Sequence, residues 1–269
     1  MLPRSNAHTH TIFSDGKNTP EEIVQAALKK GFISLGFSDH GVCTLDGDGM
    51  RDETGYCAEI ECLKSKYADQ IEIALGCEHE ALTNDADLSL FDCIIESVHF
   101  LYKDGVYTPV DVTADILKKA INRDYGGDPY AMCRDYFDRV NRSIDCTKAD
   151  VLGHLDLITK FNETEPLFDH TDTRYTKYAN ETVALAAERG IIVEINSGAM
   201  SRGYRSAPYP YSEQLRLLHE LGGKITITSD CHSADCIDFG FDKSIEIAES
   251  AGFTESWIWK DGCFRPYKL

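Results

Sequence analysis

The segment His8-Thr9-His10-Thr11-Ile12-Phe13-Ser14-Asp15 brings two histidines and a carboxylate into one short stretch of the chain. The two histidines stand one residue apart at the end of an expected strand, so both side chains point to the same side and can bind one metal ion. Asp15, at the start of the following loop, is within reach of a second ion. Imidazole and carboxylate together favour zinc, iron or manganese over calcium. An isolated pair of this kind is a chance surface feature as often as it is a metal site, so the prediction depends on whether the arrangement recurs.

Short apolar runs alternate with helical segments along the rest of the chain. Thr19-Pro20-Glu21-Glu22 predicts the start of the first helix, with Thr19 as N-cap and Glu22 closing a capping box, and Gly31 ends it. After the strand that leads to His8, the expected strands are 32–37, 71–75, 91–98, 151–152, 191–195 and 225–228. Further helices are expected around 56–67, from Thr108-Pro109 onward, and around 130–140, 173–189, 212–221 and 242–251, followed by a turn at Asp261-Gly262.

Seven mostly apolar strands separated by helices predict a parallel sheet that is covered on both faces. A closed barrel and an open doubly wound sheet both satisfy this pattern. Histidine, aspartate or glutamate follows strands one to five and strand seven, and Asn196-Ser197 follows the sixth. In a barrel all of these strand ends converge on one rim, whereas an open sheet concentrates its chemistry at one switch point. We therefore predict an α/β fold of the (β/α)7 barrel type.

The length of 269 residues suits one large α/β domain or two small ones, and the absence of a Pro/Gly/Ser-rich linker favours a single domain over 1–269. The net charge of −18 and the lack of a basic cluster argue against a nucleic-acid partner. The chain contains no run of eighteen apolar residues, and no charged-then-apolar leader precedes the first strand. We therefore expect a cytoplasmic protein with no membrane partner.

Ten cysteines are scattered along the chain without a Cys-x-x-Cys pair. In the absence of a secretory signal they are interpreted as reduced thiols, most of which fill small spaces in the core. Cys231 lies inside a motif, and a thiolate ligand at this position is left open as a less favoured alternative.

The polar strand ends form an ordered set of motifs from residue 8 to residue 232. They are His8-x-His10, Asp15, Ser38-Asp39-His40, Gly76-x-Glu78, Ser97-Val98-His99, Gly153-His154-x-Asp156 and Ser229-Asp230-x-His232. Together and in this order they resemble the polymerase and histidinol phosphatase (PHP) family of metal-dependent phosphoesterases. Many members have histidine where this chain has Asp15, and the His-x-His-x4-Asp form is similar to the histidinol-phosphatase branch.

The resemblance implies a distorted TIM-like (β/α)7 barrel that holds three divalent metal ions (Zn, Fe or Mn). By motif, the first ion would be bound by His8, His10, Glu78 and Asp230, the second by Glu78, His99 and His154, and the third by Asp15, His40 and His232. Glu80 remains an alternative to Glu78 because a strand end is easily misplaced by two residues. Asp39 and Asp156 neighbour expected ligands and are interpreted as groups that orient them.

Three divalent ions and three carboxylates would leave a local charge of about +3, which attracts a phosphate dianion despite the acidic surface. The resemblance implies hydrolysis of a small phosphate monoester by a metal-bridging hydroxide. The expected substrate is L-histidinol phosphate, an intermediate of histidine biosynthesis, which would give L-histidinol and phosphate. Asp230 or His232 would move the protons, and Asp15 is counted with them among the catalytic residues.

Substrate contacts are expected from two basic residues. The family places a basic residue in the loop after the sixth strand, where Arg202 is the nearest match and Arg205 also lies; Lys160 is a second candidate. A guanidinium can hold two phosphate oxygens, although both Arg202 and Lys160 also fit the description of ordinary solvated bases. Acidic groups that would suit a cationic alcohol are Asp46, Asp48 and Glu80.

Two other functions remain open at this point. One is a PHP phosphatase for another substrate, such as phosphotyrosine or a nucleotide, and the other is a non-catalytic metal-binding regulatory barrel. The oligomeric state is unknown. The remaining histidines, His79, His170 and His219, are expected to have no role in the site, and the Tyr130-Tyr136-Phe137 cluster is expected to pack in the core or to roof the pocket.

Overall fold

The computed structural model describes residues 4–43, 45, 48–83 and 87–269. Seven parallel strands form one sheet in the order β1-β2-β3-β4-β7-β8-β9. Their bounds are β1 Ser5–Asn6, β2 Ser34–Phe37, β3 Glu72–Glu80, β4 Cys93–Ser97, β7 Val151–Leu152, β8 Ile192–Asn196 and β9 Lys224–Thr228. β3 is longer than the sequence predicted because the polar residues at its end stay buried and keep pairing with β4.

The first and last strands meet just beyond their ends. Thr9 bridges Cys231 in parallel, and the backbone N–H of His10 donates to the carbonyl oxygen of Cys231 at 2.9 Å. The sheet is therefore a nearly closed barrel, which confirms the predicted (β/α)7 architecture.

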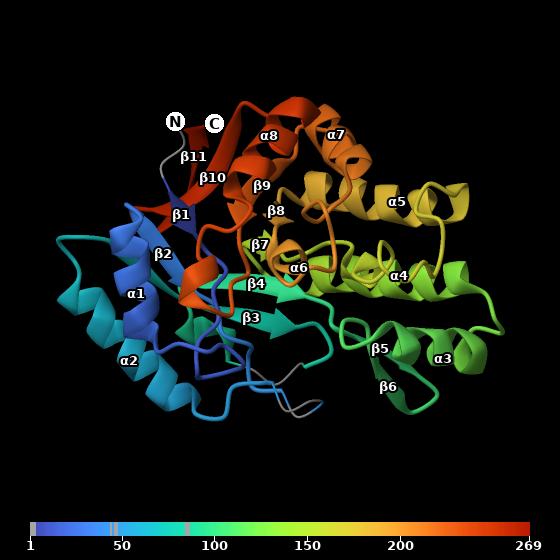
Figure 1. The fold of residues 1–269 in the computed structure, drawn as a ribbon, viewed down its shortest axis with the longest axis horizontal. Coiled ribbons are helices and arrows are strands. Elements are labelled where there is room, and N and C mark those ends of the chain that lie inside the picture. The colour runs from blue at the N-terminus through green and yellow to red at the C-terminus, as the bar shows by residue number, and fades with distance from the viewer. Residues whose placement is uncertain (1–3, 44, 46–47, 84–86) are drawn as a thin grey trace.

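Helices surround the sheet (Figure 1), with α1 and α2 along one side and α3, α4 and α5 along the other. Their bounds are α1 Pro20–Lys29, α2 Glu53–Lys66, α3 Ala114–Asp124, α4 Pro129–Cys146, α5 Thr173–Arg189, α6 Gly198–Ser201, α7 Ser212–Glu220 and α8 Phe241–Ala251. The capping box of α1 is present: the hydroxyl of Thr19 accepts from the Glu22 N–H, and the Glu22 carboxylate accepts from the Thr19 N–H. No helix in the described part of the chain has the length and apolarity needed to cross a membrane.

The prediction of a helix from Thr108-Pro109 is wrong. These two residues end strand β6 (Val106–Pro109), which pairs antiparallel with β5 (Phe100–Lys103) in a hairpin. Asp104 and Gly105 form its turn with positive φ angles of 49° and 84°, as a tight two-residue hairpin turn requires. α3 begins later, at Ala114, where the side chain of Thr113 supplies the N-cap.

A second hairpin closes the barrel at the N-terminal ends of its strands. β10 (Glu255–Lys260) and β11 (Cys263–Lys268) are joined by the predicted turn at Asp261-Gly262. Trp259 of β10 is buried in a small apolar cluster that includes Cys93, Val151 and Ile192, the first residues of β4, β7 and β8. Since the hairpin plugs this end, the opposite, carboxyl end of the barrel is the open one.

Candidate metal centre

The carboxyl ends of the strands bring together all nine residues that the motifs singled out. They follow or end β1 (His8, His10 and, in the next loop, Asp15), β2 (His40), β3 (Glu78), β4 (His99), β7 (His154) and β9 (Asp230, His232). Parallel strands place their carboxyl ends on one rim, so residues far apart in the sequence meet here.

Glu78 lies at the centre of this group, with its side chain 1% exposed. Its Oε2 lies 3.0 Å from Nδ1 of His40, 3.3 Å from Nε2 of His8 and 3.4 Å from Nε2 of His10. One oxygen therefore faces three imidazole rings from two strand ends.

The other oxygen of Glu78, Oε1, faces the opposite side. It lies 2.9 Å from Nε2 of His154 and 3.4 Å from Nε2 of His99, and it accepts a hydrogen bond from the hydroxyl of Ser97 at 2.7 Å. Glu80, two residues further on, contacts instead the other ring nitrogen of His99, Nδ1, at 3.0 Å and accepts from the backbone N–H of the same residue. Glu78 thus faces the interior of the group, and Glu80 contacts the ring nitrogen of His99 that points away from Glu78.

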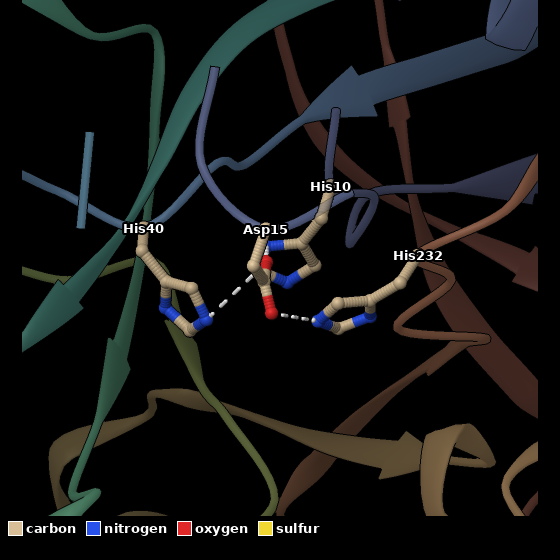
Figure 2. Close-up of side chains that lie close together, drawn as sticks. All are labelled: His10, Asp15, His40 and His232. Atoms are coloured by element: carbon tan, nitrogen blue, oxygen red, sulfur yellow. Dashed lines mark ion pairs between the residues drawn. The ribbon is translucent and has the colours of Figure 1, made fainter. Parts of the chain in front are cut away.

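Asp15 is the centre of a neighbouring group (Figure 2). Its Oδ2 lies 2.9 Å from Nε2 of His232, while its Oδ1 lies 3.8 Å from Nε2 of His40 and 3.5 Å from Nδ1 of His10. His10 and His40 each direct one ring nitrogen toward Asp15 and the other toward Glu78. The groups around Asp15 and Glu78 are therefore continuous.

Asp230 adopts an unusual backbone conformation at the end of β9, with φ of 46°. Left-handed φ is uncommon outside glycine but is tolerated by aspartate, and such residues concentrate at functional sites. The conformation directs Oδ1 to within 3.4 Å of Nε2 of His10 and 3.5 Å of Nδ1 of His232. Its second oxygen, Oδ2, lies 3.3 Å from a guanidinium nitrogen of Arg202.

This donor set fits divalent cations. Within the described residues, three groups of side chains have ligand atoms close enough to share an ion: His10, Asp15, His40 and His232; His8, His10 and Asp230; and His40, Glu78 and His99. The Nδ1 atom of His10 is buried without a hydrogen-bond partner, although the Asp15 carboxylate lies 3.5 Å away, as expected where a cation mediates between them. Imidazole and carboxylate oxygens are ligands that zinc, iron and manganese accept.

The protonation equilibria of the histidines agree with this interpretation. Burial, followed by repulsion from His232 and His40, lowers the pKa of His10 to about 3, so its ring is neutral and its lone pairs are available. Burial also opposes protonation of His40, but the Glu78 carboxylate outweighs this effect and raises the pKa of His40 to about 9. In the metal-free protein a proton therefore offsets part of the carboxylate charge, a role that a bound cation takes over when it displaces the proton.

A cavity of about 400 Å³ opens onto these side chains. Both basic residues predicted for the substrate line it: Arg202, with one guanidinium nitrogen 3.1 Å from Nδ1 of His232, and Lys160, a largely buried side chain. Arg205 does not line it; its guanidinium packs over the rings of Tyr209 and Tyr211.

Two buried or half-buried carboxylates at this end of the barrel were not predicted. Asp111 lines the cavity, with Oδ2 3.4 Å from Nζ of Lys160. Burial pushes the pKa of Asp111 upward, but the charges of Lys160, His99, His154 and His40 together outweigh it and leave the pKa below its ordinary value. Glu194, in the middle of β8, contacts Nδ1 of His8 at 2.6 Å and is fully buried. A glutamate inside an otherwise apolar strand is the sequence signal that identifies Glu194 in retrospect.

The two aspartates expected to orient ligands act on loops instead. Asp39 accepts hydrogen bonds from the backbone N–H groups of Thr11 and Ser14, at 2.8 and 3.1 Å, and so holds the loop that leads to Asp15. Asp156 accepts from the Tyr175 hydroxyl and from the backbone N–H of Tyr211.

The remaining candidates, except Asp48, lie apart from the site or outside the described residues. Cys231 belongs to none of the ligand groups found among the described residues, and burial raises the pKa of its thiol to about 12. His79 pairs with Glu96 on β4, His170 stacks on Tyr211, and His219 packs edge-on against Phe253. Tyr136 and Phe137 pack in the core, Tyr130 packs against it, Asp48 lines the cavity, and Asp46 lies outside the described residues.

The sequence and the fold have known relatives. The family model described as "PHP domain" matches residues 6–198. A Deinococcus radiodurans protein named "Probable histidinol-phosphatase" is 28% identical over 268 residues, covering 94% of this chain and 96% of that protein. The "Histidinol-phosphatase" of Bacillus subtilis is 25% identical over 271 residues, covering 91% of this chain and 99% of that protein.

Among solved structures, the histidinol phosphate phosphatase of Lactococcus lactis subsp. lactis, complexed with zinc, L-histidinol and phosphate, superposes with a TM-score of 0.76. The identity is 21%, and the match covers 97% of this chain and 98% of the other. The likeness shows that the two proteins share a fold.

Proposed function

Because the chain belongs to the PHP domain family, we propose that it is a metal-dependent phosphatase that hydrolyses L-histidinol phosphate to L-histidinol and phosphate. The observation that carries the proposal is the convergence of nine histidine and carboxylate side chains, centred on Glu78, beside a cavity that Arg202 and Lys160 also line. Relatives that cover nine-tenths or more of the chain are named histidinol-phosphatases, and a protein of the same fold binds zinc, L-histidinol and phosphate.

Three divalent ions are assigned to the site. His8, His10, Glu78 and Asp230 would hold the first, Glu78, His99 and His154 the second, and Asp15, His40 and His232 the third. Ions held by these residues would lower the pKa of bound water toward roughly 7 and would stabilise charge on the attacking and leaving oxygens. The position of Glu78, with one oxygen toward each of two imidazole groups, supports its assignment to two of the ions.

Arg202 and Lys160 bind the phosphate oxygens of the substrate. Arg202 is held in place by the carboxylate of Asp230 and by Nδ1 of His232, so its planar guanidinium reaches the cavity with its orientation already fixed. Lys160 is 7% exposed, and burial lowers its pKa against the opposing charge of Asp111. The side chains of Arg202 and Lys160 approach the cavity from different loops, and this fixes the orientation of the phosphate.

Asp230 and His232 are the groups that move protons during the reaction. His232 has Nε2 at 2.9 Å from Oδ2 of Asp15 and Nδ1 at 3.5 Å from Oδ1 of Asp230, so its ring lies between the two carboxylates. Asp15 orients that ring. As the attacking water bonds to phosphorus and the P–O ester bond breaks, the proton that this water loses passes through Asp230 or His232 to the ester oxygen, and the alcohol and phosphate are released.

The proposal is tested by elemental analysis of the purified protein followed by turnover of a phosphate ester panel. The panel contains L-histidinol phosphate, phosphotyrosine, a nucleoside monophosphate and p-nitrophenyl phosphate. We expect kcat/KM to be highest for L-histidinol phosphate and activity to disappear with chelation and return with zinc, iron or manganese. A preference for phosphotyrosine or the nucleotide would reassign the substrate, and a metal-loaded protein inert toward every ester would indicate a non-catalytic barrel.

A further inference from the structure

The chain leaves the metal centre at His99, and the β5–β6 hairpin brings it back there. The backbone N–H of Val110 donates to the carbonyl oxygen of His99 at 2.9 Å, and three residues later Thr113 caps helix α3 through the N–H of Ile116. Asp111 lies between these two fixed points. Its backbone is therefore held beside the strand end that carries His99, at the wall of the cavity.

The carboxylate of Asp111 keeps hydrogen-bonding capacity that the described residues do not use. Its side chain is 29% exposed, and Lys160, at 3.4 Å from Oδ2, is the only described residue with which it forms an ion pair or hydrogen bond. A carboxylate has about four lone-pair positions, so most of its acceptor capacity remains available at the cavity.

A carboxylate in this position is unfavourable for a plain phosphate ester. Lys160 and Arg202 attract the phosphate dianion, whereas Asp111 repels it from the same wall of the cavity. The charge arrangement becomes complementary when the alcohol part of the substrate carries a positive charge near the ester oxygen. In L-histidinol phosphate the amino group stands two carbons from that oxygen.

We propose that Asp111 binds the ammonium group of the substrate and thereby makes the enzyme specific for phosphate esters of amino alcohols. The inference rests on the proposed function and adds the residue that recognises the alcohol. Lys160 and Asp111 lie 3.4 Å apart in the lining of the same cavity, so the phosphate and the ammonium group of the substrate would meet neighbouring side chains of opposite charge.

A simpler role for Asp111 would be to position Lys160. The ammonium group of Lys160 also lies over the rings of Phe161 and Tyr204, whose centroids are 5.8 and 5.4 Å from Nζ. If Asp111 acts only through Lys160, its loss weakens phosphate binding and affects every phosphate ester equally. If Asp111 binds the ammonium group, its loss affects only esters that carry one.

The experiment compares Asp111→Asn with the wild type on two esters, L-histidinol phosphate and its analogue in which hydrogen replaces the amino group. We expect kcat/KM of the variant to fall about tenfold or more for L-histidinol phosphate, as for loss of one charged hydrogen bond. For the deamino analogue we expect no fall, because the lysine and the metal ligands are retained. Asp111→Glu, which keeps the charge, should retain most of the preference of the wild type.

Asp115→Asn is the matched control, because Asp115 lies four residues after Asp111 and its side chain is 76% exposed. The substitution removes the same charge as Asp111→Asn. It should leave both rates unchanged. Titration with L-histidinol provides a readout independent of turnover, and its Kd should rise about tenfold in Asp111→Asn while the Kd of inorganic phosphate does not rise.

Two outcomes overturn this inference and leave the proposed function standing. They are an equal loss of kcat/KM on both esters in Asp111→Asn, or a preference for the amino compound that survives the substitution. A wild-type protein that hydrolyses neither ester overturns the proposed function, and this inference with it.

Discussion

Glu194 holds His8 by a hydrogen bond between two fully buried side chains, with 2.6 Å between Oε1 and Nδ1. The same carboxylate accepts from the backbone N–H of His154 at 2.8 Å. Nδ1 of His8 donates to this carboxylate, so Nε2, which faces Glu78 and Asp230, is the nitrogen that would bind a metal ion. A carboxylate behind a ligating histidine commonly fixes its tautomer and raises its basicity.

Glu194→Gln should lower metal affinity by about 10- to 100-fold, the range observed when such supporting groups are removed from metal sites. The amide is neutral and no longer favours the Nδ1–H tautomer of His8. Competition with a chelator, followed by elemental analysis, measures the effect without reference to turnover.

Glu96→Gln is the control for this substitution. Glu96 is also buried and also contacts a histidine, Nδ1 of His79 at 2.8 Å, but neither residue lines the cavity among the described residues. We expect Glu96→Gln to cost stability and to leave metal affinity unchanged. Equal metal affinities in the two variants would show that Glu194 has no specific role.

Substitution of Glu78 should reduce metal content and kcat/KM far more than substitution of Glu80. Glu78→Gln places an amide among five imidazoles, and we expect the protein to lose at least one bound ion and roughly a hundredfold or more in kcat/KM, beyond the effect of an outer group. Glu80→Gln should lower kcat/KM by about tenfold, because Glu80 orients His99 through Nδ1 and its other oxygen accepts from the backbone N–H of Leu82. Metal content and kinetics of both variants test this, and the reverse order would exchange the roles of the two glutamates.

Gly198→Ala should impair the site without unfolding the protein. A methyl group at this position would lie 2.5 Å from Oδ2 of Asp230 and 2.9 Å from a guanidinium nitrogen of Arg202. Both side-chain ends would have to move, and a displacement of about 1 Å at a reacting centre can cost roughly 100-fold in rate. We expect kcat/KM to fall tenfold or more while Tm stays within about 2 °C of the wild type. A large drop in Tm would mean that the glycine is needed for folding.

The barrel and the convergence of polar residues on one rim could be predicted from the sequence because one physical rule connects them, whereas the choice of the nine ligands came from the resemblance to the PHP family. Parallel strands start and end on common rims, so a polar residue after each apolar run is placed on the same rim whatever the length of the helix between. Asp15, in the loop after β1, and His232, after β9, illustrate this, because the two strands stand at opposite ends of the strand order and closure of the barrel at Thr9 and Cys231 brings their ends together.

The parts of the site that the sequence did not reveal depend on side-chain direction and on hairpin register. Glu194 occupies a buried strand, where the sequence alone does not say which residues point into the barrel. Asp111 was missed because Thr108-Pro109 was interpreted as a helix start, although Asp104-Gly105 upstream is a typical hairpin turn. With the hairpin assigned, the return of Val110 to His99 would have placed Asp111 at the rim.

The hairpin that closes the other end of the barrel makes a separate prediction about stability and pH. Glu72, at the start of β3, accepts hydrogen bonds from the backbone N–H groups of Asp261 and Gly262 at 3.0 and 2.8 Å and pairs with Lys260 at 3.0 Å. Burial opposes ionisation, but the two N–H groups and Lys260 outweigh it and lower the pKa of Glu72 from its ordinary value of 4.5. The ionised carboxylate therefore stabilises the turn.

Glu72→Gln should lower the free energy of unfolding by about 1 kcal/mol near neutral pH, a modest value because the carboxylate is partly exposed. A pKa that is lower in the folded state gives stability that is complete above the unfolded-state pKa and is lost as pH falls through the folded-state pKa. The difference between wild type and variant should accordingly be constant above about pH 5 and shrink below it. Urea denaturation of both proteins in the presence of a chelator measures this difference without a contribution from metal release.

Glu255→Gln, an exposed position on the same hairpin, should give curves that match the wild type. A difference between Glu72→Gln and the wild type that stays constant down to about pH 3 would show that the carboxylate charge of Glu72 does not stabilise the turn.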